Sequence, residues 1–246
     1  MNLLEKQLKA GLVYSKTNIF KKKLRITTLS LERFFTLVEK PYLALSFGKQ
    51  SIVLAHIIHC IRPETPMLLL QSWETFIMHN MEEIIKKFLC RFPVKLHVLT
   101  RDNVSWNDWD WQRTRDHGEK DLQNLGNDVI PDWDGVIMGL SKDESVARRI
   151  TLSIGNTDWA TIFRYKNGKY RCTPIQFWNI NDLAAYIAMN DLPLLDAYRQ
   201  GGLETRTTAR ITRNNAEMNG LIDLKNRNIS AYNTIVKRFP ELSAKG

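Results

Sequence analysis

Apolar positions along the chain alternate between short continuous runs and stretches with helical spacing. Four runs, at residues 42–46, 67–71, 94–99 and 134–139, have the length and unbroken apolar character of parallel strands buried on both faces. Sequence with the spacing of helices separates them. This alternation predicts an α/β fold with a doubly wound, mostly parallel five-stranded sheet, whose ligands bind at the carboxyl ends of the strands.

Helical patterns also precede and follow this alternation. Residues 1–40 are expected to form two helices, the second beginning at Ser30. The chain then divides into an N-terminal helical segment (1–40), a central α/β domain (41–200) and a basic helical C-terminal tail (201–246). No internal repeat or low-complexity tract interrupts this order.

A β-hairpin is predicted at residues 163–171, because Asn167-Gly168 supplies the positive φ values of a two-residue type I′ turn. This hairpin is expected to bring Arg171 and Cys172 toward a ligand. Upstream, residues 101–118 combine several tryptophans with charged residues and His117. A connection of this length is typical of a lid or a partner surface, and packing on its own domain is equally compatible.

Between Leu43 and Leu54, a polar loop joins a buried strand to an apolar helix. Free backbone N–H groups at the helix start and the helix dipole favour an anion there. We expect Gly48 to allow the tight turn, and Ser46, Ser51 and Lys49 to supply donors and positive charge. Any strand-to-helix turn favours glycine and serine, so an ordinary connection stays open. The Walker and dinucleotide spacings are absent.

The pentad Ser46-Phe47-Gly48-Lys49-Gln50 resembles the modified P-loop of the phosphoadenosine phosphosulfate (PAPS) reductase family. That family belongs to the PP-loop superfamily of adenine nucleotide alpha-hydrolases. The resemblance implies the HUP fold of that superfamily, with residues 41–200 as the nucleotide-binding domain and an adenine nucleotide, ATP or PAPS, as the ligand.

Three further segments resemble the same family, and together with the loop they cover roughly residues 40–200. Residues 71–75 match a polar position followed by a Glu-Thr pair, with a long amphipathic helix expected through Leu89. Residues 139–148 are similar to Gly-x-Arg-x-x-Glu-Ser-x-x-Arg. Residues 172–198 are similar to a tail that contains Pro-Ile-x-x-Trp and Asn-x-Leu-Pro.

The resemblance assigns a set of nucleotide-binding residues: Ser46, Phe47, Gly48, Lys49, Gln50, Ser51, Ser72, Trp73, Glu74, Gly139, Lys142, Glu144 and Arg148. Within this set, the candidates for catalysis are Lys49, Glu144 and Arg148. The guanidinium of Arg148 suits two oxygens of a phosphate or sulfate at once. Glu144, one helical turn earlier, either orients Arg148 or binds the ribose, and a plain surface ion pair is the alternative.

The sequence also departs from the family's pattern. Ser141 stands where the family commonly has arginine, so one anion contact is missing or comes from Lys142. Gln50 replaces the carboxylate of the pyrophosphatases, which weakens the case for metal-assisted ATP cleavage. Thiol-dependent PAPS reductases carry a Glu-Cys-Gly-x-His nucleophile near the C-terminus, whereas no cysteine follows Tyr198. We therefore expect a reaction other than assimilatory PAPS reduction.

Cysteine and histidine positions predict no metal or iron–sulfur site. Cys60, Cys90 and Cys172 are far apart, without the spacing that holds a cluster or zinc. Cys60 and Cys90 are expected to be core or near-core thiols, and Cys172 to be structural. His56 and His59 lie among apolar neighbours, which favours packed imidazoles. Mg²⁺ is expected only as a companion of ATP.

The net charge of +9 suits an anionic ligand and is also compatible with nucleic acid. The excess is concentrated at Lys21–Lys23 with Arg25 and in the basic tail. A basic exposed face is also common in proteins that bind no nucleic acid. Without a signal-peptide pattern or a bilayer-length apolar stretch, the protein is expected to be soluble and cytoplasmic.

Two functions of different classes follow. In the first, the chain is an enzyme that acts at the phosphate or phosphosulfate of its nucleotide, in sulfur transfer or nucleotide activation. Water, a partner's thiol or a nucleic acid then accepts the transferred group. In the second, it is a non-catalytic nucleotide- or DNA-binding regulatory subunit. The resemblance implies a ParB-like or DNA-modification partner in either case, and the sequence leaves the oligomeric state open.

Overall fold

Within the residues that the structure describes, six strands form one sheet in the order β3-β2-β1-β4-β6-β5. This computed structural model describes residues 1–101, 127, 129–153, 160–205, 222, 224–226, 228–238 and 240, without the side chains of 72–75, 100, 101, 200 and 238. Only β5 and β6 pair antiparallel. The strands are β1 (Pro41–Leu45), β2 (Met67–Ser72), β3 (Leu96–Arg101), β4 (Gly135–Met138), β5 (Ile162–Arg164) and β6 (Tyr170–Cys172).

The mostly parallel α/β sheet predicted from the apolar runs is confirmed, and each predicted strand lies within two residues of an observed one. The predicted number of five strands is wrong, because both strands of the hairpin join the sheet. The central strand β1 is buried on both faces, as its unbroken apolar sequence requires. Leu43 and Leu45 belong to the main core, while Tyr42 packs edge-on against Trp133 in a second cluster, with ring centroids 5.2 Å apart.

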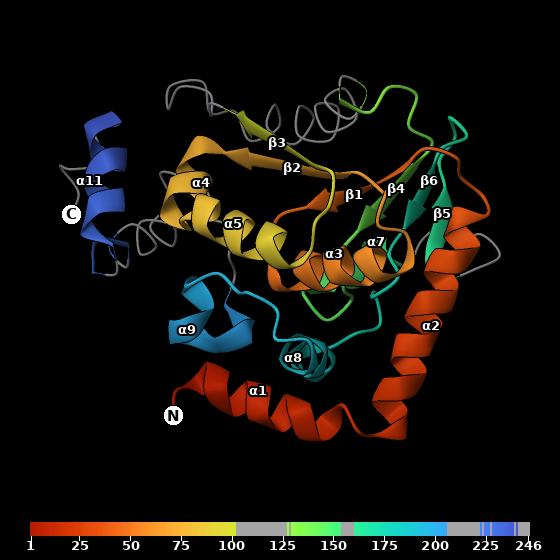
Figure 1. The fold of residues 1–246 in the computed structure, drawn as a ribbon, viewed down its shortest axis with the longest axis horizontal. Coiled ribbons are helices and arrows are strands. Elements are labelled where there is room, and N and C mark those ends of the chain that lie inside the picture. Colours follow the sequence, from red (N-terminus) through yellow and green to blue (C-terminus); the bar gives the residue numbers. More distant parts are fainter. Residues whose placement is uncertain are drawn as a thin grey trace.

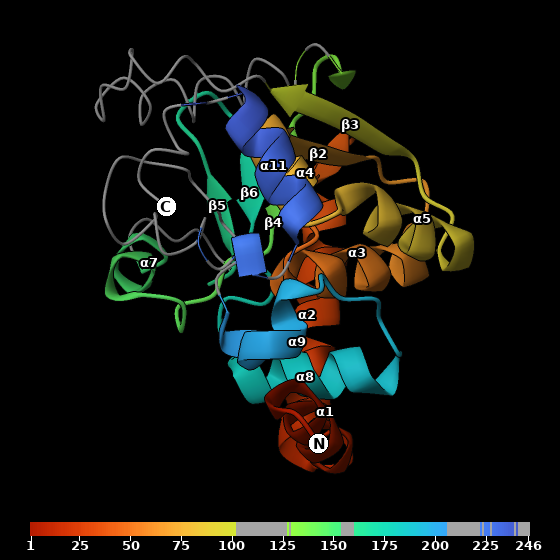
Figure 2. The same ribbon diagram turned by 90° about the vertical axis from the view of Figure 1, so that its left-hand side faces the viewer.

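Helices stack in layers below one face of the sheet. Figure 1 shows α3 and α5 against the sheet, α8 beneath α3, and α1 outermost; Figure 2 shows the same stacking from the side. Because α3 lies between the sheet and α8, residues 50–58 are all buried. The bounds are α1 (Leu3–Tyr14), α2 (Asn18–Phe35), α3 (Lys49–Ile61), α4 (Trp73–Met78), α5 (Met81–Arg91), α7 (Val146–Thr151), α8 (Ile180–Met189), α9 (Ala197–Gly201), the 3-10 helix η2 (Gly202–Glu204) and α11 (Ile229–Arg238).

The predicted start of the second N-terminal helix is wrong. Helix α2 begins at Asn18, where the side chain of Thr17 accepts the N–H of Phe20, instead of at Ser30. Ser30 is buried inside the helix. The longer helix places Phe20 and Phe34 on one face in the main core, and this burial outweighs the preference of serine for a helix start.

Both N-terminal helices share this core with the sheet. The buried carboxylate of Asp182 in α8 accepts from Lys23 Nζ at 2.6 Å, from the Tyr14 hydroxyl at 3.1 Å and from the Asn179 N–H at 2.8 Å. Helix α1 approaches α8 so closely at Gly11 that a Cβ there would stand 2.6 Å from the Ala184 carbonyl carbon. These contacts hold α1 and α2 against α8, the helix beneath α3.

The amphipathic helix expected through Leu89 is interrupted. It forms two helices, α4 and α5, separated at Asn80, which adopts a left-handed conformation with φ of 46°. Asparagine tolerates this region better than other residues with a side chain. The break directs α5 along the sheet, where Phe88 joins the main core.

The hairpin forms as predicted, with a different turn. Only Gly168 takes a positive φ, of 86°, and the Gly168 N–H donates to the Tyr165 carbonyl at 3.0 Å. A left-handed glycine that closes a longer turn replaces the type I′ pair. The guanidinium of Arg171 lies over the ring of Phe163, 4.9 Å from its centroid, and Cys172 is fully buried.

Two sequence features lie mainly outside the described residues: the tryptophan-rich segment, from residue 102 onward, and most of the basic tail. Of the tail, α11 packs on Met78 of α4 through Ala231, Tyr232 and Ile235. Among the described helices, none combines the length and the apolar character needed to cross a bilayer.

The buried imidazole of His56 makes stability depend on pH. Its Nδ1 lies 2.9 Å from the Tyr186 hydroxyl; burial, then the charges of His59 and Arg91, lower its pKa below 6.5. As pH falls below 6.5, the unfolded chain therefore takes up a proton at His56 before the folded protein does. We expect the free energy of unfolding to decline in this range and to be insensitive to this group above it. The variant His56→Asn should lose this part of the decline between pH 7.5 and 5.5 in urea titrations; an unchanged decline would contradict the assignment.

Candidate functional site

The sheet reverses its strand order between β1 and β4. From β1 the chain continues to β2 on one side, whereas β4 pairs with β6 on the other. Connections leave this point in opposite directions, which opens a crevice beyond the carboxyl ends of the two strands. A cavity of about 600 Å³ lies there, between the start of α3, the β4–α7 loop, the start of α8 and Tyr198 of α9.

The loop after β1 turns at Phe47. This residue has a φ of 53°, in the left-handed region, and its fully buried ring packs edge-on against Phe88 at 5.7 Å. Gly48 has an ordinary φ of −67°. The expectation that Gly48 makes the tight turn is therefore wrong, since the unusual conformation is carried by Phe47. Phe47 does not line the cavity, although it was placed among the nucleotide-binding residues.

Hydroxyl groups hold this loop in shape. Ser51 Oγ accepts the N–H of Ser46 at 3.2 Å and donates to the Gly48 carbonyl at 3.1 Å. The two serine hydroxyl oxygens are 3.1 Å apart, and both serines line the cavity. This network fixes the backbone that leads into α3 before any ligand is present.

The first three residues of α3, Lys49, Gln50 and Ser51, line the cavity, and the first N–H groups of a helix have no acceptor within the helix. The Lys49 N–H donates to the hydroxyl of Tyr198 at 2.9 Å. Those of Gln50 and Ser51 have no hydrogen-bond acceptor among the described residues. Gly139 lets β4 end close by, because a Cβ there would be 3.0 Å from Ser51 N. An anion held at this helix end would satisfy two open donors and the helix dipole.

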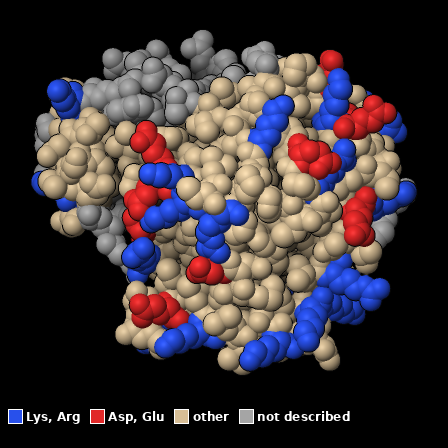
Figure 3. Space-filling view, in the orientation of Figure 1, with Lys and Arg blue, Asp and Glu red and all other residues tan. Residues whose placement is uncertain are grey.

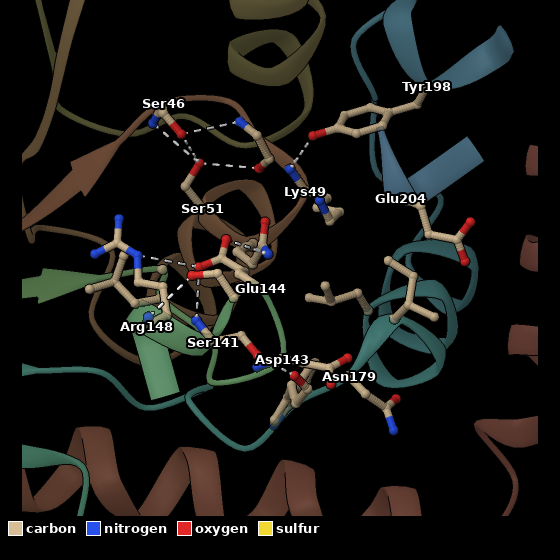
Figure 4. A pocket seen from close by; sticks show the side chains of 18 residues that line it. Ser46, Lys49, Ser51, Ser141, Asp143, Glu144, Arg148, Asn179, Tyr198 and Glu204 are labelled. Carbon is tan, nitrogen blue, oxygen red and sulfur yellow. Dashed lines mark hydrogen bonds and ion pairs between the residues drawn. The ribbon is translucent and has the colours of Figure 1, made fainter. Parts of the chain in front are cut away.

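The carboxylate of Glu144 joins the two sides of the crevice (Figure 4). Its Oε1 accepts from Gln50 Nε2 at 2.9 Å, and its Oε2 accepts from the Ser141 N–H at 3.3 Å. Arg148 Nε lies 3.8 Å from Oε2, and its side chain is 47% exposed. A loose pair this exposed contributes little stability. Glu144 therefore lies on the Nε side of Arg148, and no partner of the two terminal nitrogens is found within the described part of the chain.

The β4–α7 loop is held to the segment that precedes α8 by Ser141, the residue that stands where the family's pattern has arginine. Its hydroxyl donates to the Trp178 carbonyl at 2.6 Å and accepts the N–H of Asp143 at 3.1 Å. The arginine position of the family is thus occupied by a buried structural hydroxyl. Lys142, the proposed substitute, lies outside the cavity lining, with Nζ 4.9 Å from the ring centroid of Phe177.

The cavity brings together most of the residues singled out from the sequence. Eight of them line it: Ser46, Gly48, Lys49, Gln50, Ser51, Gly139, Glu144 and Arg148. The side chains of Ser72, Trp73 and Glu74 fall outside the described part of the chain. Arg171 and Cys172, expected near the ligand, are absent from the lining.

Other lining residues were missed as site residues: Leu140, Ser141, Asp143, Ser145, Trp178, Asn179, Ile180, Leu183, Tyr198 and Glu204. Trp178 and Tyr198 belong to the quoted tail motif, which was the signal that could have found them. Asn179 forms a capping box with Asp182 at the start of α8, a pattern readable in the sequence. No sequence motif marked Glu204, which lies beyond the tail motif that ends at residue 198.

None of the three cysteines lines the cavity. Cys172 is fully buried, and burial raises the pKa of its thiol, in agreement with the structural role expected. Cys60 and Cys90 are exposed, so the expectation that they are core or near-core thiols is wrong. Across the described residues, no group of three or more His, Cys, Asp or Glu side chains is arranged to hold a metal ion.

Comparisons with known proteins point to one family. The family model of the phosphoadenosine phosphosulfate reductase domain matches residues 40–235. A phosphoadenosine 5'-phosphosulfate reductase of Photobacterium profundum is 25% identical over 185 residues, covering 68% of each chain. One from Aliivibrio fischeri (strain MJ11) is 23% identical over 184 residues, covering 69% of this chain and 68% of that relative.

One solved structure is similar in fold, and a second aligns with a lower score. The U34-tRNA thiolase NcsA from Methanococcus maripaludis, with its [4Fe-4S] cluster, has a TM-score of 0.51 at 12% identity and covers 90% of this chain and 80% of its own. The PAPS reductase from Candida auris, in a phosphate complex, has a TM-score of 0.44 at 14% identity; the alignment covers 69% of this chain and 82% of that chain.

Proposed function

Because the chain belongs to the phosphoadenosine phosphosulfate reductase family, we propose that it is an enzyme that binds an adenine nucleotide, ATP or PAPS, in the cavity beyond β1 and β4. The observation that carries this proposal is that one cavity is lined by Arg148 and by Gln50 and Ser51, whose N–H groups have no acceptor among the described residues. Donors on two sides of one crevice suit a tetrahedral anion.

In this function each group has a separate task. The amides of Gln50 and Ser51 donate to oxygens of the phosphate or phosphosulfate. The hydroxyl of Ser46 joins them by turning its proton from the Ser51 hydroxyl to the ligand. Arg148 donates the N–H groups of its terminal nitrogens to the same phosphate or phosphosulfate, and Lys49 adds a positive charge. Glu144 is a positioning residue, since its oxygens are already engaged by Gln50, Ser141 and Arg148.

The attacking group comes from outside the cavity lining. Residues 199–246 contain no cysteine, and Cys60, Cys90 and Cys172 lie away from the lining. With ATP, an acceptor oxygen or sulfur attacks the α-phosphorus, the bond to the bridging oxygen breaks, and pyrophosphate leaves. With PAPS, a thiolate attacks the sulfur, the sulfur–oxygen bond breaks, and adenosine 3',5'-bisphosphate leaves.

Product analysis tests this function. Purified protein is incubated separately with ATP and with PAPS, with water, a dithiol or nucleic acid as acceptor. AMP with pyrophosphate identifies cleavage next to the α-phosphorus of ATP. With the dithiol, adenosine 3',5'-bisphosphate together with sulfite or a sulfonated thiol identifies attack at the sulfur of PAPS, since the nucleotide alone also forms by attack at phosphorus. Nucleotide binding without product under every condition would instead favour the non-catalytic regulatory subunit.

Arg148 should account for a large part of the affinity for nucleotide. A charge-assisted hydrogen bond contributes about 1.5–3 kcal/mol, so Arg148→Ala should weaken binding about 10–100-fold by calorimetry. Arg148→Lys should restore only part of the loss, because an ammonium cannot grip two oxygens in one plane. Arg149→Ala is the matched control, since Arg149 is exposed on the same helix outside the cavity lining. Equal losses in the two alanine variants would contradict a specific contact.

A further inference from the structure

A basic surface extends over the parts of the first two helices that lie between Glu5 and Glu32. Residues 6–31 contain no Asp or Glu and carry Lys6, Lys9, Lys16, Lys21, Lys22, Lys23 and Arg25. Lys23 is the partner of buried Asp182, and the other six are exposed. None of these six forms an ion pair with another residue of the described chain. Their mutual repulsion is left uncompensated, as expected of a surface that meets a polyanion.

We call this set of six exposed cations the α1–α2 basic surface. In the view of Figure 3, Lys and Arg side chains line the lower border of the molecule and gather at the lower right, where Figure 1 places the end of α1 and the start of α2. Exposed Ile19, Ile26 and Leu29 lie beside the cations on α2. The most apolar face of α2, which carries Phe20 and Phe34, is already buried.

This surface leads to an exposed aromatic ring beside the cavity. Lys23 Nζ donates to the carbonyl of Phe177 at 3.4 Å, and the Phe177 side chain is 51% exposed. On the other side, Lys142 Nζ lies 4.9 Å from the ring centroid. The next residue, Trp178, lines the cavity. An exposed ring between cations of two separate elements offers a stacking platform next to a track of positive charge.

We propose that the α1–α2 basic surface binds the phosphate backbone of single-stranded nucleic acid, and that Phe177 stacks on a base at the end of this track. Spaced cations and an exposed aromatic ring are the two components of such sites. A membrane-binding helix instead requires an unbroken exposed apolar face. On α2, Lys22 lies between exposed Ile26 and Leu29 around the helix axis. The proposal does not depend on the reaction in the cavity.

The test measures binding of a labelled DNA single strand of about 20 nucleotides by fluorescence anisotropy at several salt concentrations. Each phosphate contact contributes about −0.7 to the slope of log K against log salt. K21Q/K22Q/R25Q should therefore flatten the slope by about 2 and lower affinity at least about ten-fold at moderate salt. Phe177→Ala should weaken single-strand binding without changing the slope, and should leave duplex binding unchanged.

The matched control is K86Q/K87Q/K95Q, which removes three exposed lysines near α5 and makes the same change in net charge. Thermal unfolding confirms that each variant is folded. Equal effects of the two triple variants would overturn the proposal, because the binding would then reflect net charge alone. The proposal would also be overturned if the unaltered protein failed to bind the DNA single strand at low salt. Binding to phosphatidylserine vesicles, without binding to the single strand, would overturn it as well.

Discussion

Gly139→Val is expected to lower the affinity for adenine nucleotide by at least about 100-fold, equivalent to about 3 kcal/mol. A Cβ at this position would stand 3.0 Å from Ser51 N and 3.1 Å from the Gln50 carbonyl carbon. Both neighbours are backbone atoms, so the end of β4 and the start of α3 must move apart. The N–H groups of Gln50 and Ser51 then shift relative to the guanidinium of Arg148. Isothermal titration with ATP and with PAPS measures the loss, and Gly139→Ala should give a smaller one.

The control for Gly139 lies at the other end of the same strand. Gly135→Ala places a Cβ 2.6 Å from Phe34 Cζ, in the core and outside the cavity lining. This variant should lower the melting temperature and retain nucleotide affinity where it is folded. Normal affinity in Gly139→Val would place the anion elsewhere and remove the basis of the proposed function.

Phe47→Ala is expected to destabilise the protein by about 3–5 kcal/mol, as for other buried aromatic rings. Phe47→Gly should be more stable than Phe47→Ala by about 0.5–1 kcal/mol, because the left-handed conformation costs alanine more than the added chain entropy costs glycine. This order is the reverse of the usual one. Urea unfolding of the two variants measures both quantities.

Phe88 provides the comparison for Phe47. It is the ring that Phe47 contacts, it is equally buried, and it lies in a helix. There, Phe88→Gly should be less stable than Phe88→Ala by about 1 kcal/mol. The same order of stability at both positions would show that the backbone conformation at Phe47 is unimportant.

The sheet was predictable because strands buried on both faces have continuous apolar sequences. A strand such as Tyr42–Leu45 must be apolar at every position, and this character is visible without a structure. Breaks in helices were less visible. Ser30 resembles a helix start and is buried inside α2, while Asn80 ends α4 through a backbone conformation that many loops also allow asparagine. In both cases the packing of distant residues decided the outcome.

The cavity was predictable on the side formed by one continuous loop, from Ser46 to Ser51. The opposite wall comes from Trp178, Tyr198 and Glu204, which reach it only through the packing of α8 and α9. Because these residues are far from the loop in the sequence, no local pattern shows that they share a cavity with it. The role of Phe47 was hidden for another reason, since residue type points to Gly48 and only the dihedral angle shows which residue turns.

The bond between the Tyr198 hydroxyl and the Lys49 N–H ties the start of α3 to α9. A ligand oxygen that takes this third donor must first expel the phenol, and the fully enclosed ring of Tyr198 leaves little room for a sideways swing. A ligand oxygen and the Tyr198 hydroxyl therefore compete for the same Lys49 N–H. Binding of a ligand at this donor would release the contact between α9 and the start of α3.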